Sequence, residues 1–263
     1  MIRIESALVA YPQGGGEDRV VLRDLSLGVP RGQTLSIIGS NGAGKSTLLN
    51  AIAGTVPLRS GSIVVDGRDC TRDPEWIRAR YVGRVRQNPL AGTAGEMTLL
   101  DNLALASRKG PRRLRLAVTP ALSRELGERV AELGMGLENR LRENVSRLSG
   151  GQRQALTLLM AVLSRPSVLL LDEHTAALDP ANAEIVASLT KRFVAEFGLT
   201  ALIVTHDMKR ALDQAERVVM MHEGGIVADV SGEEKSRMKV SDLVELFRAA
   251  RGSEYAEDRD LLH

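Results

Sequence analysis

The sequence has little cysteine and no long apolar run. Cys70 is the only cysteine among 263 residues, which excludes a disulfide within the chain and indicates a reducing compartment. No apolar run approaches the roughly 20 residues that a membrane-spanning helix needs, so we expect any membrane function to be carried out from outside the bilayer. The first residues, MIRIESALVAYPQ, alternate in polarity and break at Pro12, which is not the pattern of a signal peptide.

The sequence also lacks a strong charge of either sign. Its 35 Lys and Arg residues nearly balance its 33 Asp and Glu residues, and the net charge of +2 does not support nucleic acid as a partner. A hydrophobic content of 43% and a charged content of 26% are those of an ordinary globular protein. The length suits one large domain or two closely packed lobes.

Strand and helix patterns alternate along most of the chain. Residues 1–35 show the period-2 alternation of strands, interrupted by QGGGED, which predicts a hairpin loop. TLSIIG predicts a short buried strand, and it is followed by a glycine-rich loop and by KSTLLNAIAG, a helix that ends at Gly54. Later, the short apolar runs SVLLLD, TALIVTHD and RVVMM are separated by helical patterns. This alternation predicts an α/β fold in which helices pack on a mainly parallel sheet.

The segment GSNGAGKST fits the phosphate-binding pattern G-x-x-x-x-G-K-[ST] and lies between a predicted strand and a predicted helix. Its glycines let the backbone N–H groups surround a β-phosphate, while Lys45 would reach the β- and γ-phosphates and Ser46 would ligate Mg²⁺. The alternative, a glycine-rich turn with a solvated lysine, does not account for the strand–loop–helix context. The predicted phosphate-binding residues are Gly39, Ser40, Asn41, Gly42, Ala43, Gly44, Lys45, Ser46 and Thr47.

Two acids follow the apolar strand in VLLLDE. Asp172 at the end of the strand would hold Mg²⁺ through water, and Glu173 would polarise the attacking water as general base. The dipeptide alone is equally typical of two solvated acids at a loop entrance. Beside a phosphate-binding loop, the catalytic interpretation is favoured.

Three further residues stand at places where they could complete such a site. His206 follows the strand in LIVTHD, and because ligands gather at the carboxyl ends of parallel strands it could contact the γ-phosphate and the water. Gln87, in RVRQNP, follows a short strand from which its amide could sense Mg²⁺ and water. Tyr11 could stack on adenine or pack on the core. A lone histidine is more often a surface residue or a core residue with its hydrogen bonds satisfied, so His206 alone would not indicate a site.

The stretch RLSGGQRQALTLLM opens a helix with small residues. Free N–H groups and the helix dipole at Ser149, Gly150 and Gly151 indicate an anion site. No lysine stands among these residues to hold a phosphate, so the rest of the pocket must lie elsewhere.

Taken in order, a tyrosine, GSNGAGKST, Gln87, LSGGQ, LLLDE, AALDP and His206 resemble the ATP-binding cassette (ABC) ATPases over nearly the whole chain. The resemblance implies ATP and Mg²⁺ as cofactors, with Ser46, Gln87 and Asp172 as metal ligands. It also implies that two cassettes close head to tail, so that LSGGQ of one contacts the γ-phosphate on the other. The residues expected to contact nucleotide in this way, or to lie between the two sites, are Ser149, Gly150, Gly151, Gln152 and Asp179.

The same resemblance predicts a single ABC ATPase domain over residues 1–263, with antiparallel β and α-helical subdomains beside a mainly parallel core. It comprises a β and P-loop region (1–87), a helical subdomain that docks a permease helix (88–145), a core with the signature and catalytic residues (146–235), and a C-terminal helix and tail (236–263). We expect the charged tail, residues 254–263, to be frayed. The basic run RKGPRRLRLAV, residues 108–118, is expected to be a solvated loop, or else to lie near lipid headgroups or the permease.

One position departs from the family pattern. Cassettes commonly read DEPT where this chain reads DEHT, with His174 in place of proline. A partly exposed structural role for His174 is expected; contact with the nucleotide is the alternative. The two acids remain, so hydrolysis should persist.

A single cassette without a membrane segment favours a transporter subunit. Cassette proteins of chromosome maintenance insert long coiled coils between the P-loop and LSGGQ, whereas this chain has only a modest helical segment there. Translation-type cassette proteins usually carry two cassettes per chain, whereas this chain has one. MTLLDNLALA and SGEEKSRMKVSDLVELF resemble ATPases of bacterial tryptophan/tyrosine-type importers, which work with a separate permease and an extracytoplasmic solute-binding protein. We therefore expect a peripheral protein on the cytoplasmic face of the membrane that pairs with a second copy or a related ABC subunit. An exporter ATPase and a non-transport ABC ATPase with soluble partners remain alternatives.

Overall fold

A computed structural model describes residues 1–13, 16–107 and 118–251. The charged tail lies outside the described residues, as does the basic run apart from Val118. These described residues form two compact units: the first lies within residues 1–79 and 200–251, and the second within residues 80–199. Among the described residues, no helix combines the length and the apolar character needed to cross a bilayer.

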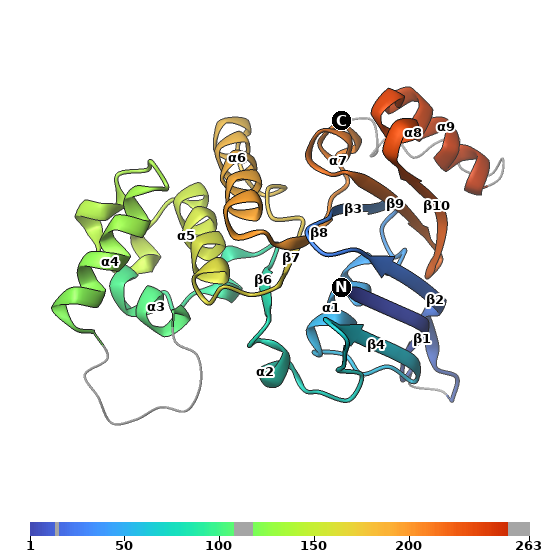
Figure 1. Cartoon of the computed structure of the whole chain (residues 1–263), viewed down its shortest axis with the longest axis horizontal. Coiled ribbons are helices and arrows are strands. Elements are labelled where there is room, and N and C mark those ends of the chain that lie inside the picture. Colours follow the sequence, from blue (N-terminus) through green and yellow to red (C-terminus); the bar gives the residue numbers. More distant parts are fainter. Residues whose placement is uncertain (14–15, 108–117, 252–263) are drawn as a thin grey trace. The chain divides into compact units, whose positions relative to one another are not determined.

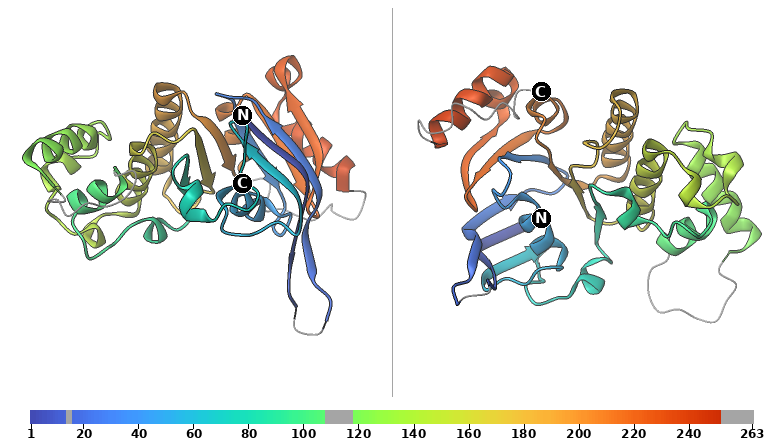
Figure 2. Two further views of the ribbon diagram at one scale, coloured as in Figure 1. Left: turned by 60° about the horizontal axis from the view of Figure 1, so that its bottom comes forward. Right: turned by 180° about the vertical axis from the view of Figure 1, so that it is seen from behind.

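The first unit contains an antiparallel sheet in the order β2-β1-β4-β5. Leu25, Leu27 and Val29 are buried and alternate with exposed residues, so the predicted period-2 pattern is confirmed. Figure 2 shows β1 and β2 side by side as a long hairpin, with Ile2 paired to Val29. The strands are β1 (Ile2–Tyr11), β2 (Arg19–Val29), β4 (Ser60–Val65) and β5 (Arg68–Asp69).

The first unit also contains parallel strands. β3 (Thr34–Gly39) lies between β8 (Thr200–Val204) and β9 (Arg217–His222) and runs parallel to both, while β10 (Gly225–Ser231) pairs antiparallel with β9. Every residue of β3 is buried, including the polar residues Thr34 and Ser36, as is typical of a parallel strand covered on both faces. The carboxyl ends of β3 and β8 therefore meet at one edge.

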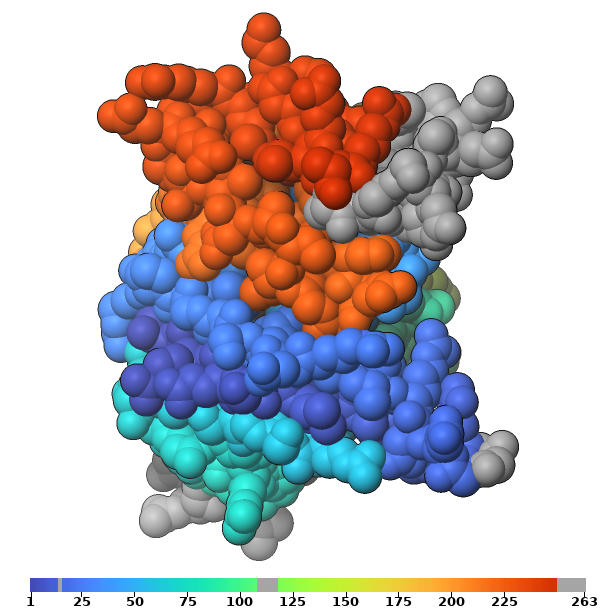
Figure 3. All heavy atoms as spheres, turned by 90° about the vertical axis from the view of Figure 1, so that its right-hand side faces the viewer, coloured from blue at the N-terminus to red at the C-terminus, as the bar shows by residue number. Residues whose placement is uncertain are grey.

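Helices complete the first unit. A hydrophobic cluster packs α7 and α9 against β3 and β9, and it includes Met208, Phe247, Ile38 and Met220. Figure 3 shows β10 and the C-terminal helices above the strands of the antiparallel sheet. The helices are α1 (Lys45–Ala53), α2 (Glu75–Arg78), α7 (Met208–Gln214), α8 (Gly232–Arg237) and α9 (Val240–Arg251).

A buried arginine closes the carboxyl end of α1. Arg78 is 2% exposed, and its Nη1 donates to the carbonyls of Ala51 at 2.6 Å and Ile52 at 3.0 Å. Its other nitrogens donate to the carbonyls of Thr71 and Asp73. Because the last carbonyls of a helix have no partner within it, Arg78 stabilises the helix that follows the glycine-rich loop.

The second unit combines the parallel pair β6 (Val82–Val85) and β7 (Val168–Asp172) with helices. Each main helix begins at a polar cap, whose side chain accepts a backbone N–H: Thr98, Thr119, Ser149 and Asp179. Figure 1 shows α5 and α6 side by side. The helices and 3₁₀ turns are η1 (Pro89–Gly92), α3 (Leu99–Ala106), α4 (Pro120–Ala131), η2 (Leu137–Arg140), η3 (Val145–Arg147), α5 (Gly150–Leu163) and α6 (Pro180–Phe197).

The predicted fold class is confirmed. Parallel strands form the centre of each unit, a separate antiparallel sheet lies in the first, and a helical segment follows β6 in the second. The described part of residues 88–145 contains helices and 3₁₀ turns and no named strand.

Candidate functional site

The predicted phosphate-binding loop connects β3 to α1. Gly39, Gly42 and Gly44 have φ angles of 148°, 80° and 98°, a left-handed region that favours glycine. A Cβ on Gly39 would lie 2.1 Å from the carbonyl oxygen of Met221, so only glycine lets β3 end against β9 in this way. Turns with left-handed glycines are typical of backbone nests that bind anions.

Lys45 lies at the first position of α1 and is 6% exposed. Its Nζ donates to the carbonyls of Gly39 at 2.6 Å and Ser40 at 2.9 Å, so the ammonium group is held against the loop. Ser46 follows and is exposed at the start of the helix. The loop thus combines a fixed positive charge, an exposed hydroxyl and a helix N-terminus, a combination that suits phosphate.

His206 reaches the same edge of the first unit as this loop. β8 is parallel to β3, Ile37 pairs with Val204, and the N–H of Thr205 donates to the carbonyl of Ile37 at 3.2 Å. His206 comes next and is exposed, and Asp207 then caps α7. The structure therefore brings the predicted loop and the predicted histidine to neighbouring strand ends.

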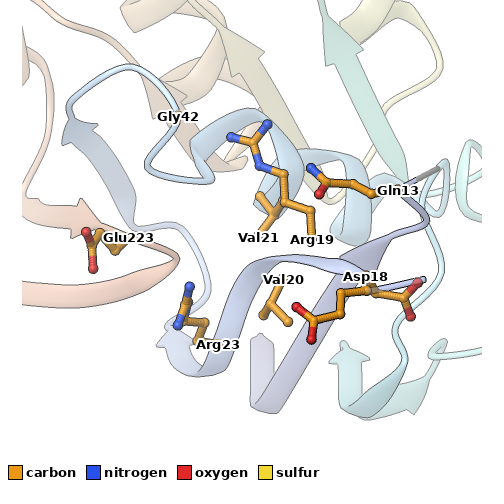
Figure 4. Close-up of a pocket in the computed structure, with 9 residues that line it drawn as sticks. Gln13, Asp18, Arg19, Val20, Val21, Arg23, Gly42 and Glu223 are labelled. Atoms are coloured by element: carbon orange, nitrogen blue, oxygen red, sulfur yellow. The ribbon is translucent and has the colours of Figure 1, made fainter. Parts of the chain in front are cut away.

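A pocket lies beside the loop and was not predicted from the sequence (Figure 4). Its lining includes the charged residues Arg19 and Arg23 from β2 and Glu223, which follows β9. Tyr11 pairs with Arg19 across the hairpin and is 37% exposed, so it is not a core residue. The residues lining the pocket are Gln13, Glu17, Asp18, Arg19, Val20, Val21, Arg23, Gly42 and Glu223.

In the second unit, the parallel pairing of β6 with β7 brings Gln87 and Glu173 together. Gln87 Nε2 donates to Glu173 Oε2 at 3.2 Å, although the two residues are 86 positions apart in sequence. Asp172 Oδ2 lies 3.8 Å from Arg84 Nη2, and both side chains are 13% exposed. The arginine, which sequence reasoning missed, offsets the charge of the predicted magnesium carboxylate.

The candidate magnesium ligands are hard oxygen donors. Ser46 offers a hydroxyl, Gln87 an amide oxygen and Asp172 a carboxylate. Within the described ranges, no three His, Cys, Asp or Glu side chains gather into a metal-binding group. Mg²⁺ characteristically uses one or two carboxylates together with water and substrate phosphates, so the chemistry of this donor set fits the ion.

The signature segment starts α5 with a capping box. Ser149 Oγ accepts from the N–H of Gln152, and Gln152 Oε1 accepts from the N–H of Ser149, both at 3.2 Å. The side chain of Gln152 is therefore engaged at the start of its own helix. Gly150 and Gly151 form the first turn, where N–H groups lack partners within the helix.

Asn182 connects Asp179 to the start of this helix. A Cβ on Gly151 would lie 2.4 Å from Asn182 Cγ, and Asn182 Nδ2 donates to Asp179 Oδ2 at 2.6 Å. The hydrogen bonds from the side chain and from the backbone N–H of Asn182 hold the pKa of Asp179 below its ordinary value. Asp179 is thus a carboxylate that also caps α6.

His174 does not have the partly exposed position expected from the sequence. It is 3% exposed, and its Nε2 lies 3.1 Å from Thr190 Oγ1 on α6. The expectation was wrong because Glu173 has a left-handed φ of 45°, and the chain turns there as it leaves β7. Sequence alternation could not show that turn.

The predicted site residues fall into two groups. The P-loop, Tyr11 and His206 belong to the first unit, and Gln87, Asp172, Glu173, the signature residues and Asp179 belong to the second. Within each group the structure brings residues from distant parts of the sequence together.

Comparison with known proteins identifies the family. Residues 22–176 match the family model described as ABC transporter. The chain is 40% identical to a tyrosine transport ATP-binding protein of Clostridioides difficile over 95% of this chain and all of that protein. It is 35% identical to the methionine import ATP-binding protein MetN of Chromohalobacter salexigens, over 87% of this chain and 64% of that protein.

Solved structures agree with the sequence comparisons. The dimeric post-hydrolysis structure of the ATP-binding cassette MJ0796, bound to ADP and Pi, matches with a TM-score of 0.75 and 26% identity. The match covers 88% of this chain and 98% of that one. The chain therefore belongs to the ABC transporter family, as an ATP-binding subunit that hydrolyses ATP.

Proposed function

We propose that the P-loop holds the phosphates of ATP and that Glu173 activates the water that attacks the γ-phosphorus. Left-handed glycines, the start of α1 and Lys45 supply the positive surroundings that a triphosphate needs. Ser46, Gln87 and Asp172 would hold Mg²⁺, which when bound neutralises charge on the phosphates. His206 would contact the γ-phosphate, and Tyr11 would stack on the adenine.

The chain would work as one ATPase domain over residues 1–263 that pairs head to tail with a second copy. Phosphoryl transfer depends on positioning and charge neutralisation, and the N–H groups of Gly150 and Gly151, beside the capping residue Ser149, would add donors only after closure. MJ0796, whose structure is a dimer bound to ADP and Pi, supports this arrangement. Binding of ATP would then favour the closed pair, and hydrolysis would release it.

A substitution at the signature tests whether the site is shared between chains. Ser149→Arg should leave ATP binding to the single chain nearly unchanged while stopping hydrolysis, because the bulky cation would block closure against the partner. Equal loss of binding and hydrolysis would contradict a shared site.

We infer further that the dimer drives a membrane permease that imports tyrosine or a similar amino acid. The observation that carries this proposal is the 40% identity to the tyrosine transport ATP-binding protein, which extends over that protein's whole length. The subunit would lie on the cytoplasmic face of the membrane, with a solute-binding protein acting on the far side of the permease.

Capture from native membranes tests the transporter assignment. The tagged chain is purified after gentle solubilisation, and the proteins that accompany it are identified. A polytopic permease is expected, and the complex in vesicles should take up tyrosine only with ATP and not with the Glu173→Gln variant. Recovery of soluble partner proteins alone would contradict the transporter proposal but would leave the ATPase assignment unaffected.

A further inference from the structure

His174 is a buried polar side chain directly after Glu173. Its exposed fraction is 3%, that of its partner Thr190 is 2%, and the distance between His174 Nε2 and Thr190 Oγ1 is 3.1 Å. Thr190 lies on the buried face of α6, between the buried residues Val186 and Phe193. A buried polar pair of this kind is costly to separate, because neither partner would meet water.

The direction of this hydrogen bond follows from the second contact of the threonine. Thr190 Oγ1 donates its one proton to the carbonyl of Val186 at 2.8 Å. The same oxygen must therefore accept from His174, whose Nε2 carries the proton. The bond is directional, and it fixes the imidazole ring relative to α6.

The backbone that this ring anchors is unusual. Glu173 has a φ of 45°, a conformation that residues other than glycine rarely adopt and that persists only where the surroundings hold it. On one side, Gln87 donates to its carboxylate at 3.2 Å; on the other, its carbonyl accepts from the N–H of Ala176 at 3.0 Å. His174 is the next residue along the chain and joins the turn to a helix of 18 residues.

We propose that His174 is a positioning residue, whose hydrogen bond to Thr190 fixes the left-handed backbone of Glu173 and so the direction of its carboxylate. This inference rests on the proposed role of Glu173 as general base. A small rotation at Glu173 moves the carboxylate away from the attacking water, and misplacement by about 1 Å can cost about a hundredfold in rate. The bond therefore controls turnover and not the affinity for ATP.

Thr190→Val tests the proposal with little change in volume. We expect kcat for ATP hydrolysis to fall about tenfold or more, while KM and the ATP dissociation constant change less than about twofold. Thr190→Ser keeps the accepting hydroxyl and should retain most of the activity. His174→Gln keeps an N–H donor and should be more active than His174→Leu.

Thr157→Val is the matched control. Thr157 is a buried helical threonine on α5 whose Oγ1 donates to the carbonyl of Arg153 four residues earlier, at 2.8 Å, and it has no bond to His174. Its replacement removes the same kind of helical bond and should leave kcat within about twofold of the original. An equal fall in kcat for Thr157→Val and Thr190→Val would overturn the proposal.

A double-mutant cycle between Glu173 and Thr190 separates this inference from the assignment of Glu173 as the base. In a Glu173→Gln background, Thr190→Val should lower the residual rate no further, because the bond acts through Glu173. The same factor in both backgrounds, or unchanged kcat for Thr190→Val in the original chain, would overturn the positioning role alone. Normal turnover by Glu173→Gln itself would overturn the base assignment and this inference together.

Discussion

Replacement by alanine should destabilise the protein at only one of the two adjacent glycines in the signature segment. A Cβ on Gly151 would lie 2.4 Å from Asn182 Cγ and 2.7 Å from Asn182 Cβ. Rotating the asparagine side chain moves Cγ but not Cβ, so α5 and α6 must also shift apart. A Cβ on Gly150 meets its nearest neighbour, Leu178 Cδ2, at 3.8 Å, which is an ordinary contact.

The expected magnitudes follow from packing and helix propensity. Overpacking typically costs about 1–3 kcal/mol, and moving Asn182 also disturbs its 2.6 Å bond to Asp179. Replacing glycine by alanine within a helix raises the free energy of unfolding by about 0.5–1 kcal/mol. Gly151→Ala should therefore lower the free energy of unfolding by about 1–2 kcal/mol, whereas Gly150→Ala should leave it unchanged or raise it slightly.

Urea denaturation followed by circular dichroism, without nucleotide, compares the two variants with the original chain. Parallel transitions allow the midpoints to be compared directly, and the midpoint of Gly151→Ala should be the lower of the two. Equal stability of the variants would refute the close packing of α5 on Asn182 that the structure shows.

Three further predictions concern charges. Lys45→Ala should raise the dissociation constant for ATP at least about tenfold, because a charge-assisted bond to phosphate is lost; unchanged affinity in a binding titration would contradict the P-loop proposal. Arg78→Met should lower the free energy of unfolding by about 3 kcal/mol, since the buried carbonyls of Ala51 and Ile52 lose the guanidinium donor, and a urea midpoint close to that of the original chain would be inconsistent with this role. Asn182→Ala should raise the pKa of Asp179 toward its ordinary value, which a carboxyl NMR titration would detect. Because the folded-state pKa of Asp179 is lowered, its contribution to stability is present at neutral pH and is lost as the pH falls through that lowered pKa.

Local patterns in the sequence were enough to place the main elements. The alternation before Val29 predicted a hairpin, and the glycines around Lys45 predicted a strand, a loop and a helix, because these signals depend on backbone geometry within a few residues. The signature helix was likewise visible from Ser149 onward, since a capping serine and small residues mark a helix start.

Long-range pairings could not be predicted in this way. Arg84 meets Asp172 because β6 pairs with β7, and nothing near either residue encodes that register. Arg19 lines the pocket because the hairpin places it opposite Tyr11. His174 is buried against Thr190 on α6, 16 positions further along the chain, a contact that no local pattern around His174 encodes.

Sedimentation of the Glu173→Gln variant tests the central proposal most directly, namely that ATP closes two copies of this chain around a shared site. The variant should bind ATP without hydrolysing it, so the closed pair should accumulate. With Mg²⁺ and saturating ATP, we predict a shift from the mass of one chain to that of two, and no shift with ADP or after adding Ser149→Arg. A single-chain mass at saturating ATP would contradict the proposal.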